Sequence, residues 1–370
     1  MRNIKPVMMI IALLVTAAFN TLPSAAQGPP DQPDLTIDAR VKTDVIDAAI
    51  KSLNEGYIFP EVAKKMETML RDRVQKKEYD GITSAKQFAT TLTNHLQEVS
   101  KDKHLRVRYS HEAIPQRERR APTPEEIEEY RKFGRSVNFG FEKIERLEGN
   151  IGYLDMRGFF GADAGAPTAS AAMNFLANSD ALIIDLRKNG GGDPAMVAFV
   201  TSYLYDEQPV HLNDLYFRPT DSTRQWWTLP HVPGQKLGSK KDVYVLTSKR
   251  TFSAAEEFTY NLKNLKRATI IGETTGGGAH PGGVQRLNPN FGMFVPTGRA
   301  INPISKTNWE GTGVKPDIEV PADHALKVAQ ITAIQKLKEK SKDEKATLQY
   351  ERLLDTAQKE LDELKKNQKP

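Results

Sequence analysis

The segment 247–258, T-S-K-R-T-F-S-A-A-E-E-F, places a serine where it could act as a nucleophile. The stretch 242–247 predicts a buried strand and the residues from Ala254 predict a helix, so Ser253 lies at the turn between them. At such a turn the N–H of Ala254 and the positive end of the helix dipole stand beside any oxyanion that forms. A plain helix N-cap is the alternative interpretation, because serine is a preferred capping residue.

A glycine-rich loop, D-L-R-K-N-G-G-G-D-P over 185–194, follows a second apolar strand. Its three glycines free the backbone to aim N–H groups into a cleft, which makes Gly191 a candidate second oxyanion donor. The loop also fits the dinucleotide pattern G-x-G-x-x-A, ending at Ala195. That fit is weak, because polar residues separate the strand from the glycines and Pro194 crowds the helix start. A nucleotide-binding enzyme would show measurable nucleotide affinity.

Four motifs, in order over residues 40–322, resemble peptidase family S41, the tail-specific and C-terminal processing peptidases. D-L-R-K-N-G-G-G resembles the family's D-L-R-x-N-x-G-G signature, and T-S-K-R-T-F-S-A-A-E-E-F resembles its nucleophile segment. I-I-G-E-T-T-G-G-G-A-H-P-G and N-W-E-G-T-G-V-K-P-D-I-E-V are similar to the retinoid-binding-protein-like and tricorn-core branch. The resemblance implies an α/β catalytic domain with a crotonase- or ClpP-like spiral, preceded by an α-helical N-terminal domain.

The resemblance also addresses which group activates Ser253. The processing peptidases use a lysine whose aligned position here is Gly278, and no Lys or Arg occurs over 268–285. The tricorn-like branch instead uses a histidine, and D-K-H over 102–104 resembles its D-x-H segment, which implies His104 as the base. Glu310, in N-W-E-G-T-G, would then orient the imidazole. Lys103 stands where the tricorn core has a serine, which leaves the triad of Ser253, His104 and Glu310.

His280 is a second histidine near the presumed cleft and competes with His104 as the base. We interpret it, with Gly277 and Gly278, as part of a possible substrate pocket. The remaining histidines show no H-E-x-x-H spacing, and the chain has no cysteine, so neither a metal nor a cofactor is expected.

The elements that must position these residues fall into five expected segments. Residues 1–26 resemble a signal peptide, residues 27–110 form a helical domain that carries His104, and 111–135 form a linker with a short helix. The catalytic domain is expected over 136–322, where strands alternate with helices, and charged helices over 323–370. The connection from 110 to 137 is too short for a PDZ domain, so capture of protein C-termini is not expected.

The N-terminus predicts export. Arg2 and Lys5 precede an apolar stretch at 7–19, and small residues at 24–26 suit signal peptidase. The apolar stretch has 13 residues, against roughly 20 needed to span a bilayer, so cleavage is favoured over a stable membrane anchor. A periplasmic or extracellular location is expected.

The composition permits a globular enzyme. The chain is 370 residues long with 39% hydrophobic and 27% charged residues, and its charges of both signs are interspersed, which disfavours a nucleic-acid partner. We therefore expect a serine peptidase that acts on peptides or proteins. Assembly into a homo-oligomer is compatible with the sequence. The main alternative is a non-catalytic carrier of lipophilic ligands on the same fold.

Overall fold

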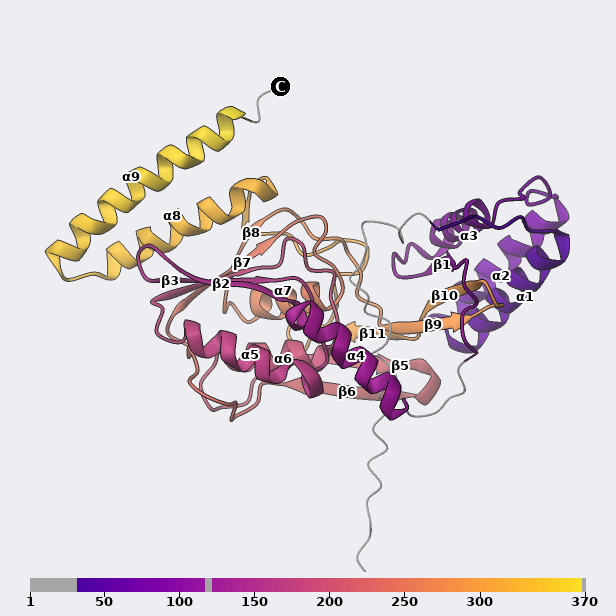
Figure 1. Cartoon of the computed structure of the whole chain (residues 1–370), viewed down its shortest axis with the longest axis horizontal. Helices are drawn as coiled ribbons and strands as arrows, with labels where there is room; N and C mark the ends of the chain where they lie inside the picture. Colours follow the sequence, from indigo (N-terminus) through magenta and orange to yellow (C-terminus); the bar gives the residue numbers. More distant parts are fainter. Residues whose placement is uncertain (1–31, 117–121, 368–370) are drawn as a thin grey trace, which may run out of the picture.

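The computed structural model describes residues 32–116 and 122–367 (Figure 1). The predicted signal peptide, 1–26, lies outside the described residues. Two bodies are visible in Figure 1: a helical module formed by the N-terminal part and a larger α/β module from β2 onward. None of the helices in the described ranges is long and apolar enough to cross a membrane.

Three amphipathic helices build the helical module: α1 Ala39–Gly56, α2 Pro60–Gln75 and α3 Ala85–Ser100. Asp38 and Ser84 cap α1 and α3, because each side chain accepts a hydrogen bond from a backbone N–H of the first turn. The apolar stripe that predicted these helices is buried in one core, which includes Leu53, Phe88 and Leu92.

A three-stranded antiparallel sheet joins the two modules. Its order is β1-β10-β9, with bounds β1 Arg106–Tyr109, β10 Phe291–Pro296 and β9 Gly282–Arg286. Since β1 comes from the N-terminal segment and β9 and β10 from the catalytic segment, a domain boundary placed at 110 cuts through this sheet. The sheet is therefore the structural connection that carries His104 toward the α/β module.

Six strands form the central sheet of the α/β module, in the order β12-β8-β7-β4-β3-β2. Their bounds are β2 Phe141–Leu147, β3 Ile151–Met156, β4 Ala181–Asp185, β7 Asp242–Thr247, β8 Thr269–Gly272 and β12 Ile318–Glu319. The strands from β3 to β12 run parallel, and β2 pairs antiparallel to β3. A parallel sheet covered on both faces explains the continuously apolar strands of the sequence.

Helices cover both faces of this sheet. On one face α5 Ala162–Leu176, α6 Pro194–Ser202 and α7 Ala254–Asn264 share a core with residues such as Leu182 and Ile184. On the other face α8 Ala322–Lys340 packs on Ile183 and Tyr244. The last helix, α9 Glu344–Asn367, packs against α8 and extends away from the body in Figure 1. The expected α/β class with charged C-terminal helices is confirmed.

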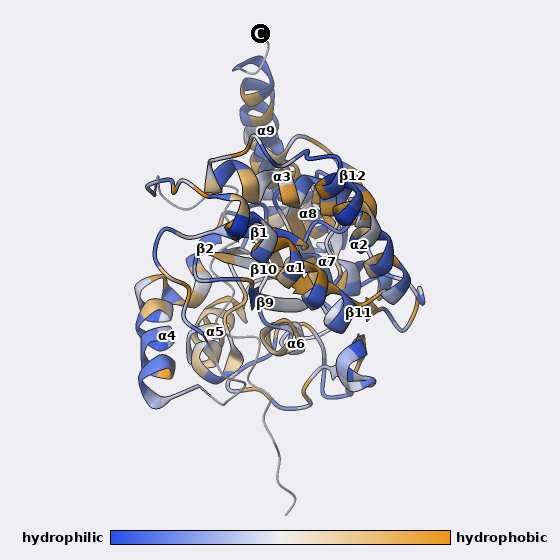
Figure 2. Cartoon of the chain, turned by 90° about the vertical axis from the view of Figure 1, so that its right-hand side faces the viewer, coloured by the Kyte–Doolittle hydropathy of each residue, from blue (hydrophilic) through white to orange (hydrophobic). Residues whose placement is uncertain are grey.

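The remaining elements border the α/β module. A small antiparallel sheet has the order β11-β5-β6, with β5 His211–Phe217, β6 Ser222–Trp227 and β11 Gly298–Ile301. Helix α4, Pro124–Ser136, is the short helix expected over 111–135 and begins at a capping box formed by Thr123 and Glu126. Figure 2 shows α4 as mainly hydrophilic and the neighbouring α5 as paler, which agrees with α4 lying on the outside.

Candidate active site

Ser253 begins α7 in a backbone conformation that an ordinary cap does not need. Its φ is 55° and its ψ is −122°, whereas N-cap residues usually lie in the extended region with negative φ. A non-glycine residue there costs on the order of 1–3 kcal/mol, and such strain clusters at functional sites. The conformation therefore favours the nucleophile interpretation of Ser253 over simple capping.

The buried carboxylate of Glu256 fixes the turn that carries Ser253. It accepts the backbone N–H of Ser253 at 2.9 Å, the N–H of Gly277 at 2.6 Å and that of Gly278 at 2.8 Å. The hydroxyl of Thr275 donates to the same carboxylate at 2.5 Å. Burial raises the pKa of Glu256 to about 7, while the four donors favour its ionised form. The Glu256 side chain thus binds both the Ser253 turn and the glycine run 276–278.

The loop over 189–193 lies directly against Ser253. A Cβ built on Gly191, whose φ is +108°, would stand 2.7 Å from the Cβ of Ser253 and 2.9 Å from the N of Ala254, so only glycine fits. The N–H of Gly191 donates to Oδ1 of Asn189 at 2.9 Å, whereas the Ala254 N–H has no hydrogen-bond acceptor among the described residues. Of the two expected oxyanion donors, the Ala254 N–H is available, whereas the Gly191 N–H must first break its hydrogen bond to Asn189.

His104 reaches this region from the helical module. Its ring lies 4.6 Å, between centroids, from that of Phe252, and stacks on Phe294 at 5.6 Å. A Cβ at Gly278 would approach Cε1 of His104 to 2.6 Å, so the imidazole lies directly on the glycine run. Nδ1 of His104 is enclosed and has no hydrogen-bond partner, and among the described residues no hydrogen bond joins His104 to Ser253.

Burial also decides the protonation state of His104. It lowers the pKa of the imidazole to about 4, with Asp102 opposing the shift and His280 adding to it. A neutral imidazole at neutral pH is the form that can accept a proton from a serine hydroxyl.

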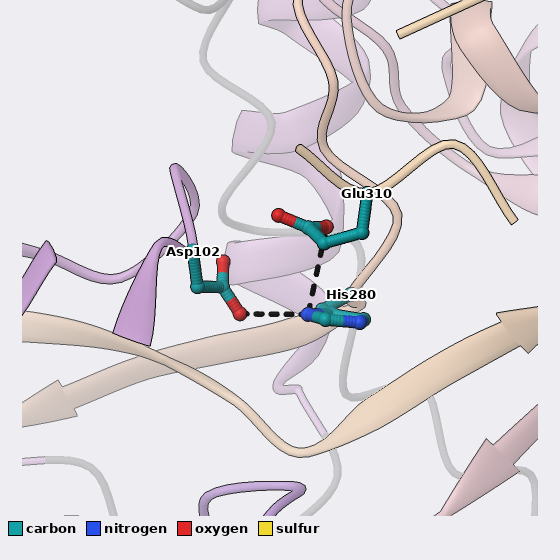
Figure 3. A group of neighbouring side chains, drawn as sticks. All are labelled: Asp102, His280 and Glu310. Atoms are coloured by element: carbon teal, nitrogen blue, oxygen red, sulfur yellow. Dashed lines mark hydrogen bonds and ion pairs between the residues drawn. The ribbon is translucent and has the colours of Figure 1, made fainter. Parts of the chain in front are cut away.

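Asp102, His280 and Glu310 meet where the two modules join (Figure 3). Nδ1 of His280 donates to Oδ2 of Asp102 at 2.8 Å and lies 3.5 Å from Oε2 of Glu310. Oδ1 of Asp102 accepts the backbone N–H of His104 at 3.0 Å, and the Tyr57 hydroxyl donates to Oδ2 at 3.3 Å. The Asp102–His280 pair therefore fastens the turn that carries His104 onto the α/β module.

Electrostatics within this group favour a charged histidine and make the glutamic acid a weaker acid than usual. Burial alone would lower the pKa of His280, but the hydrogen bond and charge of Asp102 outweigh it and raise that pKa. Burial, reinforced by the negative charge of Asp102, raises the pKa of Glu310 to about 7. The ligand atoms of Asp102, His280 and Glu310 lie within 4.8 Å of one another, a spacing that could hold a cation. The hydrogen bonds that Asp102, His280 and Glu310 already make explain why these side chains lie together, without a bound cation.

Glu310 lies beside His280 rather than hydrogen-bonded to His104. Its Oε2 accepts the N–H of Ala279 at 2.5 Å, while its Oε1 is enclosed and unpartnered. Since His104 packs on Gly278 and Glu310 on the next residue, the two side chains border the same short segment. Each has one buried polar atom without a partner.

The residues expected to form a substrate pocket instead support the site. His280 is buried, and the N–H groups of Gly277 and Gly278 are occupied by Glu256. Asn189, Glu256 and Asp102 were missed as functional residues. Two had a signal in the sequence: Glu256 follows Ser253 at the S-x-x-E capping-box spacing, and Asp102 opens the D-x-H segment.

Two family models match adjoining parts of this chain. The model of peptidase family S41 matches residues 150–320, and that of the N-terminal domain of Peptidase_S41 in eukaryotic IRBP matches residues 36–144. The chloroplastic carboxyl-terminal-processing peptidase 2 of Arabidopsis thaliana is 28% identical over 181 residues, 46% of this chain. The match spans only 32% of the length of that relative.

Two solved structures share the fold. A candidate peptidase from Parabacteroides merdae has a TM-score of 0.51 and 20% identity, covering 76% of this chain and 90% of that one. A lipoprotein from Streptococcus agalactiae has a TM-score of 0.52 and 15% identity, covering 82% and 99%. The two structures show the fold alone. The two family models, which match adjoining parts of the sequence over most of its length, show that the chain belongs to peptidase family S41.

Proposed function

We propose that this protein is a serine peptidase that hydrolyses peptide bonds through an acyl-enzyme, with Ser253, His104 and Glu310 as its triad. Ser253 Oγ attacks the scissile carbonyl carbon, and His104 takes the hydroxyl proton. When the C–N bond breaks, the imidazolium returns that proton to the leaving amine, and water then hydrolyses the ester by the same route. The N–H of Ala254 stabilises the oxyanion.

The observation that carries the proposal is the packing of His104 on Gly278. That position aligns with the lysine base of the processing peptidases, and any side chain there would collide with the imidazole and with Phe252. An imidazole supplied by the helical module thus takes the space that a lysine would need. This exchange supports His104 as the base in place of a Ser–Lys dyad.

Completion of the triad requires His104 and Glu310 to come into hydrogen-bonding contact. The unpartnered Nδ1 of His104 and Oε1 of Glu310 are complementary, since a neutral imidazole can donate from Nδ1 and a carboxylate accepts. Pairing them leaves Nε2 to face Ser253. In this account Glu310 fixes the tautomer of His104 and stabilises the imidazolium.

Covalent labelling of Ser253 tests the peptidase proposal against the lipophilic-carrier alternative. A fluorophosphonate should form an adduct on Ser253, identified by peptide mass spectrometry, that is absent from Ser253→Ala and present in the control Ser222→Ala. Folded wild-type protein that forms no adduct, yet retains fatty ligands, would support the carrier.

The substrates are proposed to be exported proteins or peptides, because residues 1–26 have the pattern of a cleaved signal peptide. Protein recovered from outside the cytoplasm should begin at Gln27 when its N-terminus is sequenced. Recovery of the full chain with Met1 in the cytoplasm would contradict this.

A further inference from the structure

Three arginines lie on one face of the sheet that joins the modules. Arg106 pairs across the strands with Phe294, and Arg108 pairs with Gly292, which in turn pairs with Arg286. Directly opposed residues in an antiparallel sheet project from the same face. Val107 and Met293 project from the other face into the helical core. We refer to Arg106, Arg108 and Arg286 as the arginine face.

The arginine face is continuous with the catalytic region. His104 stacks on Phe294, which is the cross-strand partner of Arg106. Arg106 therefore flanks the same aromatic ring as the proposed base, and Arg108 lies two residues further along β1, roughly 6–7 Å away. Ile114 covers the part of this face between Arg108 and Arg286, since a Cβ on Gly292 would stand 3.3 Å from its Cδ1. An extended peptide held at Ser253 would therefore meet the end of the face at Arg106 first.

No carboxylate among the described residues forms an ion pair with Arg106, Arg108 or Arg286. Two of the three are oriented by backbone carbonyls: Nε of Arg106 donates to Lys103 O at 2.9 Å, and Nε of Arg286 donates to Ile114 O at 2.8 Å. Their terminal Nη groups are left without acceptors in the described ranges. Arg108 and Arg286 are both exposed.

The three positive charges of the arginine face repel one another, which is unusual for a purely structural feature. Protein atoms packed around the exposed Arg108 side chain displace water from its guanidinium, and this desolvation, followed by the charge of Arg106, lowers the pKa of Arg108. Like charges gathered without counter-ions cost stability, which a bound anionic group would recover. Oriented guanidinium forks with free Nη groups suit carboxylates, which they bind with two parallel hydrogen bonds.

We infer that the arginine face binds acidic side chains of the substrate, so that the enzyme prefers peptides with Asp or Glu at alternate positions on one side of the cleaved bond. The alternation follows from the geometry, because side chains of an extended peptide point to one side at every second residue. Electrostatic attraction would also speed the association of acidic peptides at low ionic strength. This inference rests on the proposed peptidase function.

Digestion of a peptide library by the mature protein, with rates expressed per fluorophosphonate-labelled Ser253, tests the inference. Acidic residues should be enriched at alternate positions, and replacing them with Gln or Asn in matched peptides should lower kcat/KM roughly tenfold. The double variant R108E/R286E should reverse the preference toward Lys and Arg. The control R352Q, on exposed α9, should keep it. Thermal unfolding of each variant establishes that it is folded.

The outcomes separate the two proposals. Wild-type protein that is not labelled at Ser253 would refute the peptidase function itself. Labelled protein that cleaves acidic and neutral peptides equally, or whose preference survives R108E/R286E, would overturn the arginine-face inference alone. A preference that disappears when peptide C-termini are amidated, and is insensitive to Glu→Gln exchange, would overturn it by assigning recognition to the terminal carboxylate.

Discussion

The two halves of the site are held in different ways. Ser253 and the glycine run are fixed inside the α/β module by Glu256, whose carboxylate accepts four hydrogen bonds. His104 comes from the helical module, its Nδ1 has no partner, and its backbone is held by Asp102. The proposed nucleophile is thus held within one module, while the position of the proposed base depends on how the two modules meet.

The difference follows from the chain connectivity. Residues 253 and 256 lie in one helical turn, so their mutual position is set as soon as α7 forms. His104 and Glu310 are far apart in sequence and meet only through tertiary packing at the module junction. Contacts of that kind are easily altered by relative motion of domains, so we expect the base to be the more adjustable partner.

The largest effect should come from removing the base. His104→Ala should lower kcat by about 10²–10⁴-fold, because positioned base catalysis contributes that much, with little change in stability. Steady-state kinetics and thermal unfolding measure both quantities. The exposed His231→Ala serves as the control. Turnover that survives in His104→Ala but is lost in His280→Ala would assign the base to His280 and remove the contrast between the halves.

Glu256→Gln should damage the half that carries Ser253. An amide can replace only one carboxylate oxygen, so its NH₂ group would face two donors that then lack acceptors, at a cost of about 2–4 kcal/mol in the free energy of unfolding. Activity should fall in parallel because the Ser253 turn loosens. The neighbouring Glu257→Gln should not destabilise the protein, because the buried Glu257 side chain forms no ion pair among the described residues. Equal unfolding midpoints in denaturant for both variants would contradict the role assigned to Glu256.

Asp102→Asn should loosen the other half with a smaller effect. The amide weakens the pair with His280 and the acceptor for the His104 backbone, and we expect kcat to fall about tenfold while KM changes little. The rate of Ser253 labelling should fall by the same factor. A purely structural role would lower stability without moving kcat per labelled site, and that result would contradict a positioning function for the pair.

The smallest effect concerns pH and stability. Burial raises the pKa of Glu257 to about 8, and those of Glu256 and Glu310 to about 7. These three groups bind more protons in the folded protein than in the unfolded chain between pH 4.5 and about 8, so their contribution to the free energy of unfolding should fall as pH rises through that range. In Glu257→Gln that fall should shrink by on the order of 1 kcal/mol. An unchanged pH dependence in chemical denaturation would show that Glu257 ionises normally.

The sequence predicted most of the parallel core because its strands are apolar on both faces. The stretch 242–247 matches β7, the apolar strand before the glycine-rich loop matches β4, and the expected helical domain over 27–110 contains α1, α2 and α3. The short strands β9, β10 and β11 were missed, since glycines and exposed residues break their alternation. Their pairing with β1 and β5 is long-range and depends on tertiary contacts, which local patterns do not encode.

At the candidate active site, local sequence motifs identified the residues that meet there but did not predict which side chains contact one another. The sequence predicted that Gly191 lies beside Ser253 and Ala254, and the structure has this arrangement. The reason is that both segments follow the ends of neighbouring parallel strands. Glu310 was expected to orient His104, yet its carboxylate lies against the Ala279 N–H and the His280 ring. No spacing rule could place His280 against Asp102, because this contact joins two modules. The triad itself stays a prediction.

The pH dependence of Ser253 labelling tests the central claim most directly, since the two candidate bases titrate on opposite sides of the usual histidine value. If His104 is the base, the acid limb of the labelling rate lies well below pH 6.5 and the rate collapses in His104→Ala. An acid limb above pH 6.5 that persists in His104→Ala and vanishes in His280→Ala would contradict the account.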